Sequence, residues 1–156
     1  MSRRHRAKVR DIIIESKYNN LSLTRFINKV MKSGKKSLAR KIVYSALEEA
    51  EAKANKPGIE IFNQAISNVA PSVILKSRRV GGANYQVPTE LPSEKSQTLA
   101  MRWIIESARS RTGSAYYLRL ARELLDASNS QGPAVKRKDD IHKMAEANKA
   151  FAHFRW

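Results

Sequence analysis

Residues 76–88 read KSRRVGGANYQVP, and this stretch distinguishes the fold from a plain helical bundle because it interrupts an otherwise helical pattern. Residues 73–75 (VIL) and 85–87 (YQV) are β-favouring runs on either side of two glycines. Gly81 and Gly82 can adopt the positive φ values that a two-residue hairpin turn requires. The glycine pair is therefore better explained as a hairpin turn than as a phosphate-binding loop or as filler.

The predicted hairpin spans residues 72–90 and should form an arm. Pro88 cannot donate a hydrogen bond to a ladder, which suits a two-stranded ribbon because both of its strands are edges. An isolated ribbon is only marginally stable in water. We therefore expect the distal, basic part of the arm to gain order by docking on something else.

The rest of the sequence is helical, with apolar residues at spacings of three, four and seven. A first helix begins near Ser22 and stops at Gly34, and a second follows with Leu38 on its inward side. A break at Pro71 ends the third, Ser93 can cap a fourth, and Ser114 opens a fifth. The sixth is broken near its aromatic end. These features predict one mainly α domain over residues 1–156, a six-helix bundle with the β-hairpin arm between the third and fourth helices.

The composition points to a polyanionic partner. The 156 residues include 30 Lys and Arg against 14 Asp and Glu, a formal net charge of +16. Basic residues that meet phosphates release condensed counterions, so nucleic acid and an anionic membrane surface are both candidates. No run approaches the roughly 20 apolar residues of a spanning helix, and we expect a soluble chain without a secretory signal. The absence of Cys excludes disulfides and thiolate chemistry.

The first residues form the densest basic patch. Residues 1–18 are predicted to be a flexible extension, because its first part has almost nothing to bury and could order against phosphates. The alternative is a solvated tail. The basic side chains of this extension are Arg3, Arg4, Arg6, Lys8 and Arg10.

The sequence GKKS at residues 34–37 resembles the end of a Walker A loop, but the first glycine of that motif is missing because position 29 is Lys. Gly34 is better explained as a helix C-cap, with Ser37 opening the next helix. Lys35, Lys36 and the following Arg40 and Lys41 then surround a helix N-terminus, where free N–H groups favour anions. An ordinary solvated helix end is the alternative.

Asp139, His142 and Glu146 could present two carboxylates and an imidazole on one helix face. Charged helices often contain such triples by chance, and ion pairs along the helix explain this one adequately. We therefore favour a structural role for these three residues over a catalytic or metal-binding role.

Several aromatic residues lie on predicted core faces, namely Phe26, Phe62 and Trp103. Three other aromatic residues do not belong to the apolar face of any predicted helix. RNA contact and local packing are both open for these, which are Tyr85, Phe154 and Trp156.

Four separated motifs occur in the same order as in a known protein family, and the resemblance covers the whole chain. They are GKKSLARKIVY (34–44), KSRRVGGANYQVP (76–88), LAMRWII (99–105) and HKMAEANKAFAHFRW (142–156). The chain resembles the bacterial-type family of small-subunit ribosomal protein seven. The chain departs from the family's pattern at two places. After the second strand it has ELPSEKSQ, where the family usually carries paired arginines. Before the first Tyr it has IIIES, which lacks the family's Asp-Pro.

The resemblance implies a structural protein that binds the 3′ major domain of small-subunit rRNA, nucleates assembly of the head and lies near the exit-site tRNA. It also implies contacts with ribosomal proteins nine and eleven, mRNA nearby, no cofactor and no catalysis. The expected location is the bacterial cytoplasmic ribosome, with an organellar ribosome as an alternative.

Carried over by position, the resemblance implies rRNA-binding residues in five regions. These are Arg3, Arg4, Arg6, Lys8 and Arg10 in the extension; Lys35 and Lys36; Lys76, Arg78 and Arg79 in the arm; Arg102, Arg109 and Arg111; and Lys136, Arg137, His142, Lys143 and Lys149. The tip residues Gly81, Gly82, Ala83, Asn84 and Tyr85 would approach the exit-site tRNA.

Two other functional classes remain open on the residues alone. A basic helical DNA-binding or mRNA-binding regulator would have a similar composition, although a repressor usually needs a dimer seam and a recognition helix. A hydrolase built on Asp139, His142 and Glu146 is the less favoured alternative.

Overall fold

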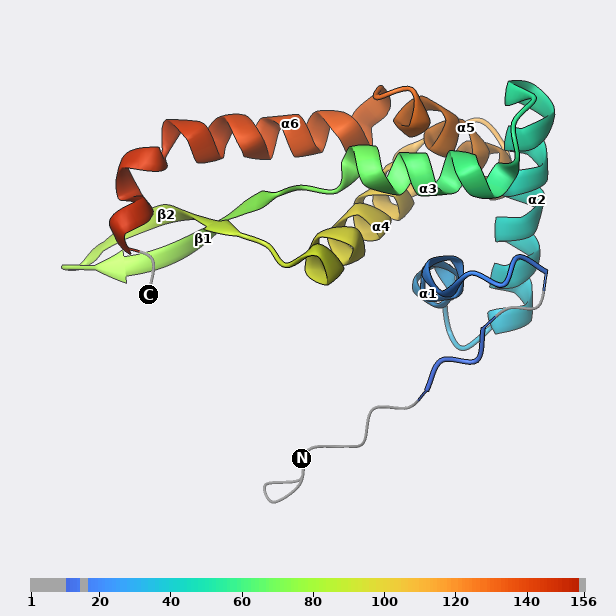
Figure 1. The fold of residues 1–156 in the computed structure, drawn as a ribbon, viewed down its shortest axis with the longest axis horizontal. Helices are drawn as coiled ribbons and strands as arrows, with labels where there is room; N and C mark the ends of the chain where they lie inside the picture. Colours follow the sequence, from blue (N-terminus) through green and yellow to red (C-terminus); the bar gives the residue numbers. More distant parts are fainter. Residues whose placement is uncertain (1–10, 15–16, 155–156) are drawn as a thin grey trace, which may run out of the picture.

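The computed structural model describes residues 11–14 and 17–154, and it confirms a mainly helical fold with a hairpin between the third and fourth helices (Figure 1). The described part contains six α-helices, one short 3₁₀ helix and two strands. In chain order they are α1 (Leu21–Val30), α2 (Lys36–Ala54), α3 (Gly58–Val69), β1 (Val73–Val80), β2 (Ala83–Glu90), α4 (Ser93–Ser110), α5 (Tyr116–Ser128), α6 (Gly132–Ala147) and η1 (Lys149–Phe154).

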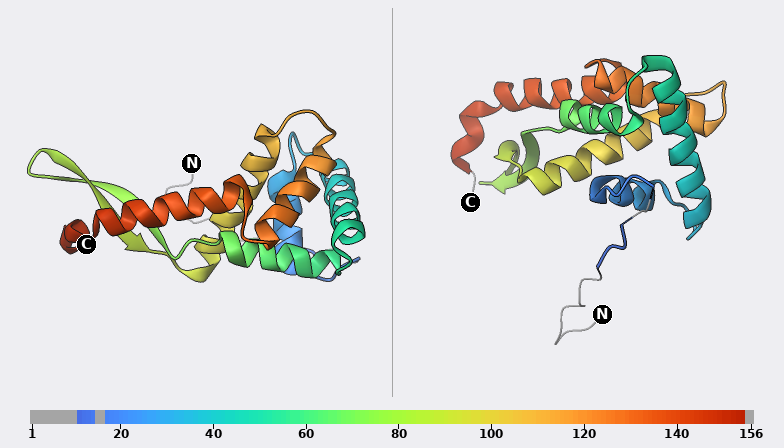
Figure 2. Two further views of the ribbon diagram at one scale, coloured as in Figure 1. Left: turned by 90° about the horizontal axis from the view of Figure 1, so that it is seen from above. Right: turned by 45° about the vertical axis from the view of Figure 1, so that its right-hand side comes forward.

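The core lies where α1 to α5 and the first turn of α6 meet, and Figure 2 shows the arm extending away from these helices. Phe26 of α1 and Phe62 of α3 are fully buried and pack edge to face, with ring centroids 5.2 Å apart. Trp103 is 4% exposed, which confirms these three aromatics as core residues. Burying each such side chain contributes about 1.5–3 kcal/mol, so the apolar stripes fix the helix faces.

Local signals set the helix ends only in part. Asn20 caps α1, because its side-chain oxygen accepts a hydrogen bond from the N–H of Leu23 at 2.9 Å. The expected cap at Gly34 was wrong: α1 ends at Val30, Met31 is its C-cap, and Gly34 lies in the following turn with φ 73°. Ser93 makes no side-chain capping bond and is the first residue of α4.

The first turn of α2 also differs from expectation. The helix starts at Lys36, and Leu38, which the apolar spacing placed inward, is 52% exposed. The reason is that Ala39, Val43 and Ala46 already meet the core at this end of α2. No partner element in the described chain covers the side on which Leu38 lies.

The hairpin forms as predicted. The strands pair antiparallel from Val73 opposite Glu90 to Val80 opposite Ala83, which leaves a two-residue turn. Gly81 and Gly82 both have positive φ, 57° and 90°, as the primed turns of tight hairpins require.

The arm does dock on another element, and that element is the chain's own C-terminal part. Figure 1 shows α6 running from the helical body to the arm, where η1 lies against β2. Val87 is 1% exposed, and the Tyr85 ring lies 5.1 Å from Phe151 and 5.2 Å from Phe154. The predicted break in the sixth helix is confirmed, because η1 turns these aromatic residues onto the hairpin.

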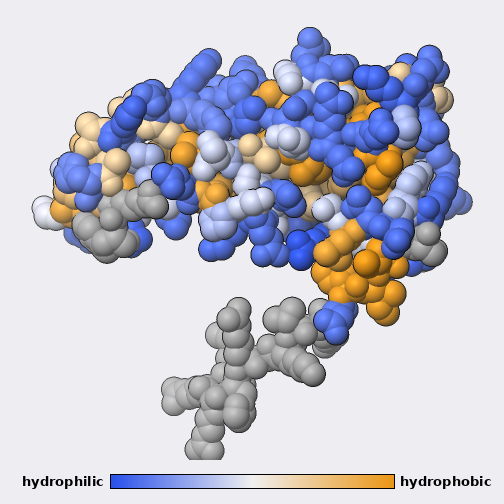
Figure 3. Space-filling model, in the orientation of Figure 1, coloured by the Kyte–Doolittle hydropathy of each residue, from blue (hydrophilic) through white to orange (hydrophobic). Residues whose placement is uncertain are grey.

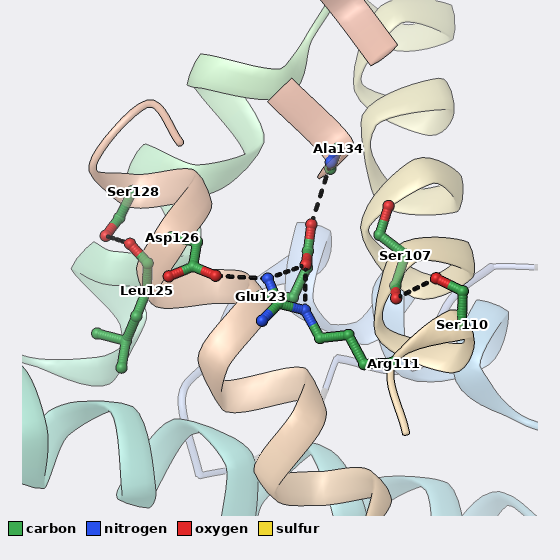
Figure 4. Close-up of polar contacts among 8 residues, drawn as sticks. All are labelled: Ser107, Ser110, Arg111, Glu123, Leu125, Asp126, Ser128 and Ala134. Atoms are coloured by element: carbon green, nitrogen blue, oxygen red, sulfur yellow. Dashed lines mark hydrogen bonds and ion pairs between the residues drawn. The ribbon is translucent and has the colours of Figure 1, made fainter. Parts of the chain in front are cut away.

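A buried carboxylate joins α4, α5 and α6 (Figure 4). Glu123 has no exposed side-chain surface; it accepts hydrogen bonds from Arg111 Nε at 2.8 Å and from the N–H of Ala134 at 3.2 Å. Arg111 also pairs with Asp126. Burial raises the pKa of Glu123 while Arg111 and the Ala134 N–H oppose that rise, so the guanidinium is what makes a carboxylate tolerable here.

Candidate nucleic-acid interface

Basic side chains of α1 and α4 face one another across a groove. Arg25 and Lys29 are four residues apart on α1, and Arg102 and Arg109 are seven apart on α4, so each pair lies on one side of its helix. Lys29, Arg102 and Arg109 line a groove of about 240 Å³. Burial lowers the pKa of Lys29, and the charges of Arg102 and Arg25 lower it further. Cations are thus held close enough to repel one another.

The turn between α1 and α2 extends this surface. Lys32, Lys35 and Arg109 line a second, larger groove of about 440 Å³. Ser33 and Gly34 have positive φ, 53° and 73°, which reverses the chain between the two lysines. We call the combined surface the α1–α4 basic face, and it consists of Arg25, Lys29, Lys32, Lys35, Arg102 and Arg109.

Few acidic groups balance this face. Arg25 pairs with Glu94 at 3.2 Å, but the Glu94 side chain is 75% exposed, so the pair is weak. Within the described chain no carboxylate forms an ion pair with Lys29, Arg102 or Arg109. Glu106 also lines the smaller groove, where it pairs with Arg137, whereas none of the described residues that line the larger groove is acidic. Grooves lined mainly by one sign of charge focus the field and attract counter-ions, so this face can bind a polyanion.

The predicted residues of α6 lie in a more mixed environment. Arg137 pairs with Glu106 at 2.5 Å and lies over the Trp103 ring, and Lys149 pairs with Glu146 at 3.3 Å. Lys136 and Lys143 are exposed, but they line one groove together with Asp139 and Asp140.

His142 has a structural contact, since its Nε2 accepts a hydrogen bond from the N–H of Ser72 at 3.2 Å. That bond ties α6 to the start of β1. No group of His, Asp and Glu that could hold a metal occurs among the described residues, Asp139 and Glu146 included.

The predicted basic residues of the arm separate onto its two faces. Cross-strand partners share a face, so Lys76 and Arg78 lie on the side of Val87 and Tyr85, which packs on η1. Arg79 lies on the opposite side with its partner Asn84, and both are exposed.

At the tip, four residues are exposed and the fifth is not. Gly81, Gly82, Ala83 and Asn84 are exposed, whereas Tyr85 is half-buried among Phe151 and Phe154. Local packing therefore explains Tyr85 and Phe154. Trp156 lies outside the described residues.

The remaining predicted residues do not join the α1–α4 basic face. Arg111 turns into the α4–α5–α6 junction, where its charge is balanced by Glu123 and Asp126. The basic residues of the N-terminal extension, which are Arg3, Arg4, Arg6, Lys8 and Arg10, lie outside the described range. Lys36 is half-buried beside the exposed Lys35 at the start of α2.

Sequence reasoning missed Arg25, Lys29 and Lys32. A signal was present, because Arg25 and Lys29 are four residues apart on α1 and neither is among its buried residues. What the spacing cannot reveal is that α4 places Arg102 opposite Lys29.

The model of the family described as ribosomal protein S7p/S5e matches residues 2–149. The chain belongs to this family. It is therefore a structural, non-enzymatic ribosomal protein, a class that binds rRNA within a ribonucleoprotein and serves translation.

Curated relatives cover the entire chain and are covered entirely by it. The small ribosomal subunit protein uS7 of Xanthobacter autotrophicus is 54% identical over 156 residues, and that of Azorhizobium caulinodans is 53% identical. The protein of the same name from Roseobacter denitrificans is 54% identical. These matches confirm the resemblance to the small-subunit family.

No helix in the described part of the chain is both long enough and apolar enough to cross a membrane.

Proposed function

We propose that this chain is a primary rRNA-binding protein of the small subunit in the bacterial cytoplasmic ribosome, which binds the 3′ major domain and nucleates assembly of the head. The relatives are small-subunit proteins by name. The observation that carries the proposal is the α1–α4 basic face, whose cations come from two helices and one turn and have few acidic partners.

The chemistry of this face suits folded RNA. Phosphate contacts position a protein, and double-stranded RNA is recognised mostly through its shape and backbone. The two grooves separate Lys32 and Lys35 from Lys29 and Arg102, with Arg109 lining both. The face can therefore neutralise phosphates of two strands where rRNA helices meet.

The arm and α6 supply the second part of the proposal. Arg79 and Asn84 are exposed on the free face of the arm, near its Gly81–Gly82 turn. We assign this tip to the neighbourhood of the exit-site tRNA, with mRNA nearby. Contacts with ribosomal proteins nine and eleven complete the proposed setting, and they rest on the family resemblance.

Binding to isolated rRNA domains tests the proposal. The full chain should bind a 3′ major domain transcript at least tenfold more tightly than a 5′ domain transcript of equal length, and affinity should fall steeply as salt rises. Equal affinity for both transcripts, or for arbitrary duplex DNA, would favour the regulator alternative. An affinity that does not respond to salt would contradict the role of the basic face.

Footprinting separates the body from the arm. An Arg79→Ala variant should protect the head-domain rRNA as the wild type does and lose protection only near the exit site in assembled subunits. Arg122→Ala, which removes an exposed arginine of α5, is the matched control and should change neither footprint.

A further inference from the structure

The larger groove of the α1–α4 basic face has an apolar floor that the phosphate contacts do not use. Val30, Leu38, Ala39, Ile42 and Tyr116 line it, and they come from three helices. Leu38 is 52% exposed there. Leu38 lies beside the partly buried Ile42 and Tyr116 in this lining, so the floor offers apolar contact area to a ligand.

The rim of the same groove is cationic. Lys32, Lys35 and Arg109 stand beside the floor, and none of the described side chains that line the groove is acidic. An apolar floor with a wholly basic rim is complementary to one class of ligand on the RNA, a nucleotide with a flat base and phosphates on both sides. The groove volume of about 440 Å³ is within the range of small-molecule sites.

A buried hydroxyl, that of Tyr116, belongs to a residue that lines this groove. Tyr116 Oη makes no hydrogen bond of acceptable geometry within the described chain, although Arg109 is close enough to affect its pKa. Burial raises the pKa of Tyr116, and Arg109 and Arg119 oppose that rise. The hydroxyl thus keeps its proton, and a buried donor without a partner favours a ligand that supplies one.

We propose that this groove binds one unpaired nucleotide of the RNA. Its base lies on Leu38, Ile42 and Tyr116, and its flanking phosphates contact Lys32, Lys35 and Arg109. The inference rests on the proposed rRNA-binding function and adds a preference for a bulged or looped nucleotide, since only an unstacked base can reach the floor.

Two RNA hairpins of equal length test the inference, one fully paired and one with a single bulged 2-aminopurine nucleotide. The wild-type chain should bind the bulged hairpin about tenfold more tightly, as expected for one base in contact with an apolar and aromatic surface. The 2-aminopurine fluorescence should change on binding. Leu38→Ala and Tyr116→Phe should each reduce the tenfold preference while keeping affinity for the paired hairpin.

Leu21→Ala is the matched control, because Leu21 is an exposed leucine of α1 that does not line the groove. It should retain the full preference. Circular dichroism of each variant checks that the fold is intact, and Tyr116→Phe keeps the ring, so it tests the hydroxyl alone.

The outcomes separate the two proposals. Salt-sensitive binding of both hairpins with equal affinity would overturn the nucleotide site and leave the rRNA-binding function standing. A bulge preference that survives both Leu38→Ala and Tyr116→Phe would also overturn it. Failure to bind either hairpin or the 3′ major domain transcript would instead contradict the proposed function.

Discussion

The arginines in α4 and the arginine directly after it lie in two different electrostatic environments. On the side of α1, Arg102 and Arg109 face Lys29 in a groove where cations predominate. Directly after α4, toward α5 and α6, Arg111 pairs with Glu123 and Asp126. The charges of Arg102 and Arg109 remain available to a partner, whereas the charge of Arg111 is balanced inside the fold.

This difference shows why a count of basic residues is a poor guide to a binding surface. Arg109 and Arg111 are two positions apart and look equivalent in the sequence, yet one lines a surface groove and the other secures a helix junction. In a region of low exposure an unpaired charge is costly, so a carboxylate within reach determines the role of an arginine. Substitutions in the two environments should therefore have different consequences for stability and for RNA binding.

Removing Arg111 should have the largest effect on stability. Arg111→Ala leaves Glu123 buried without its counter-ion, which should lower the free energy of unfolding by about 3 kcal/mol near neutral pH. Burial already raises the pKa of Glu123, and losing Arg111 raises it further. A raised folded pKa favours the protonated folded state, so the deficit should shrink as pH falls.

Urea unfolding of Arg111→Ala at several pH values measures this, with Arg102→Ala as the surface control. Arg102 is exposed, so its removal should change stability by less than about 0.5 kcal/mol. A deficit below 1 kcal/mol for Arg111→Ala would mean that the junction does not depend on the ion pair.

The pair Arg102 and Arg109 should matter most for RNA. The double variant Arg102→Gln, Arg109→Gln should bind the 3′ major domain about tenfold more weakly at physiological salt. The slope of log K against log salt concentration should become less steep by about 1 to 2. The matched variant Lys136→Gln, Lys143→Gln removes two exposed cations at the same spacing on α6. Its effect should be smaller, because Asp139 and Asp140 line the same groove. Equal losses for both variants would remove the distinction between the two surfaces.

The aromatic contact between arm and η1 should have a moderate, local effect. Phe151→Ala removes a ring 5.1 Å from Tyr85, and aromatic pairs of this kind contribute about 1 kcal/mol. Amide hydrogen exchange in β1 and β2 should become several-fold faster while the core of α3 and α5 stays protected. Tyr117→Ala, at an exposed aromatic residue of α5, should leave exchange in the arm unchanged.

The pair Arg137 and Glu106 should contribute least. Both side chains are about half exposed, at 49% and 46%, so a double-mutant cycle should give a coupling of about 0.5 kcal/mol that decreases with salt. A coupling above 2 kcal/mol would show that the contact of Arg137 with Trp103 turns this into a buried, strongly coupled site.

Figure 3 shows an apolar, orange patch beside α1. In the segment before α1, Ile12, Ile13 and Ile14 are 38%, 84% and 44% exposed. Lys17 and Tyr18 are anchored, because Lys17 pairs with Glu48 and Tyr18 packs edge to face on Tyr44. Nothing in the apolar spacing of the helices predicts this isolated run.

Much of the fold follows from local signals. The Gly81–Gly82 turn between two β-favouring runs predicts the hairpin, and the apolar spacing predicts all six helices. The errors occur where the signal is ambiguous. Leu38 fits the apolar spacing of α2 but lies at an end of the helix where Ala39 and Val43 already meet the core, and Gly34 looks like a helix cap because glycine suits a cap and a turn equally well.

The secondary structure elements, the positive charge and the family can be inferred from the sequence alone, because period, turn chemistry and motif order are local properties of the chain. Which cations remain available depends on the tertiary structure. The placement of Arg102 opposite Lys29, of Arg111 against Glu123 and of Tyr85 against Phe151 depends on how distant helices pack. The free energy of each charge depends on its burial and on its partner, and both exist only once those elements pack together.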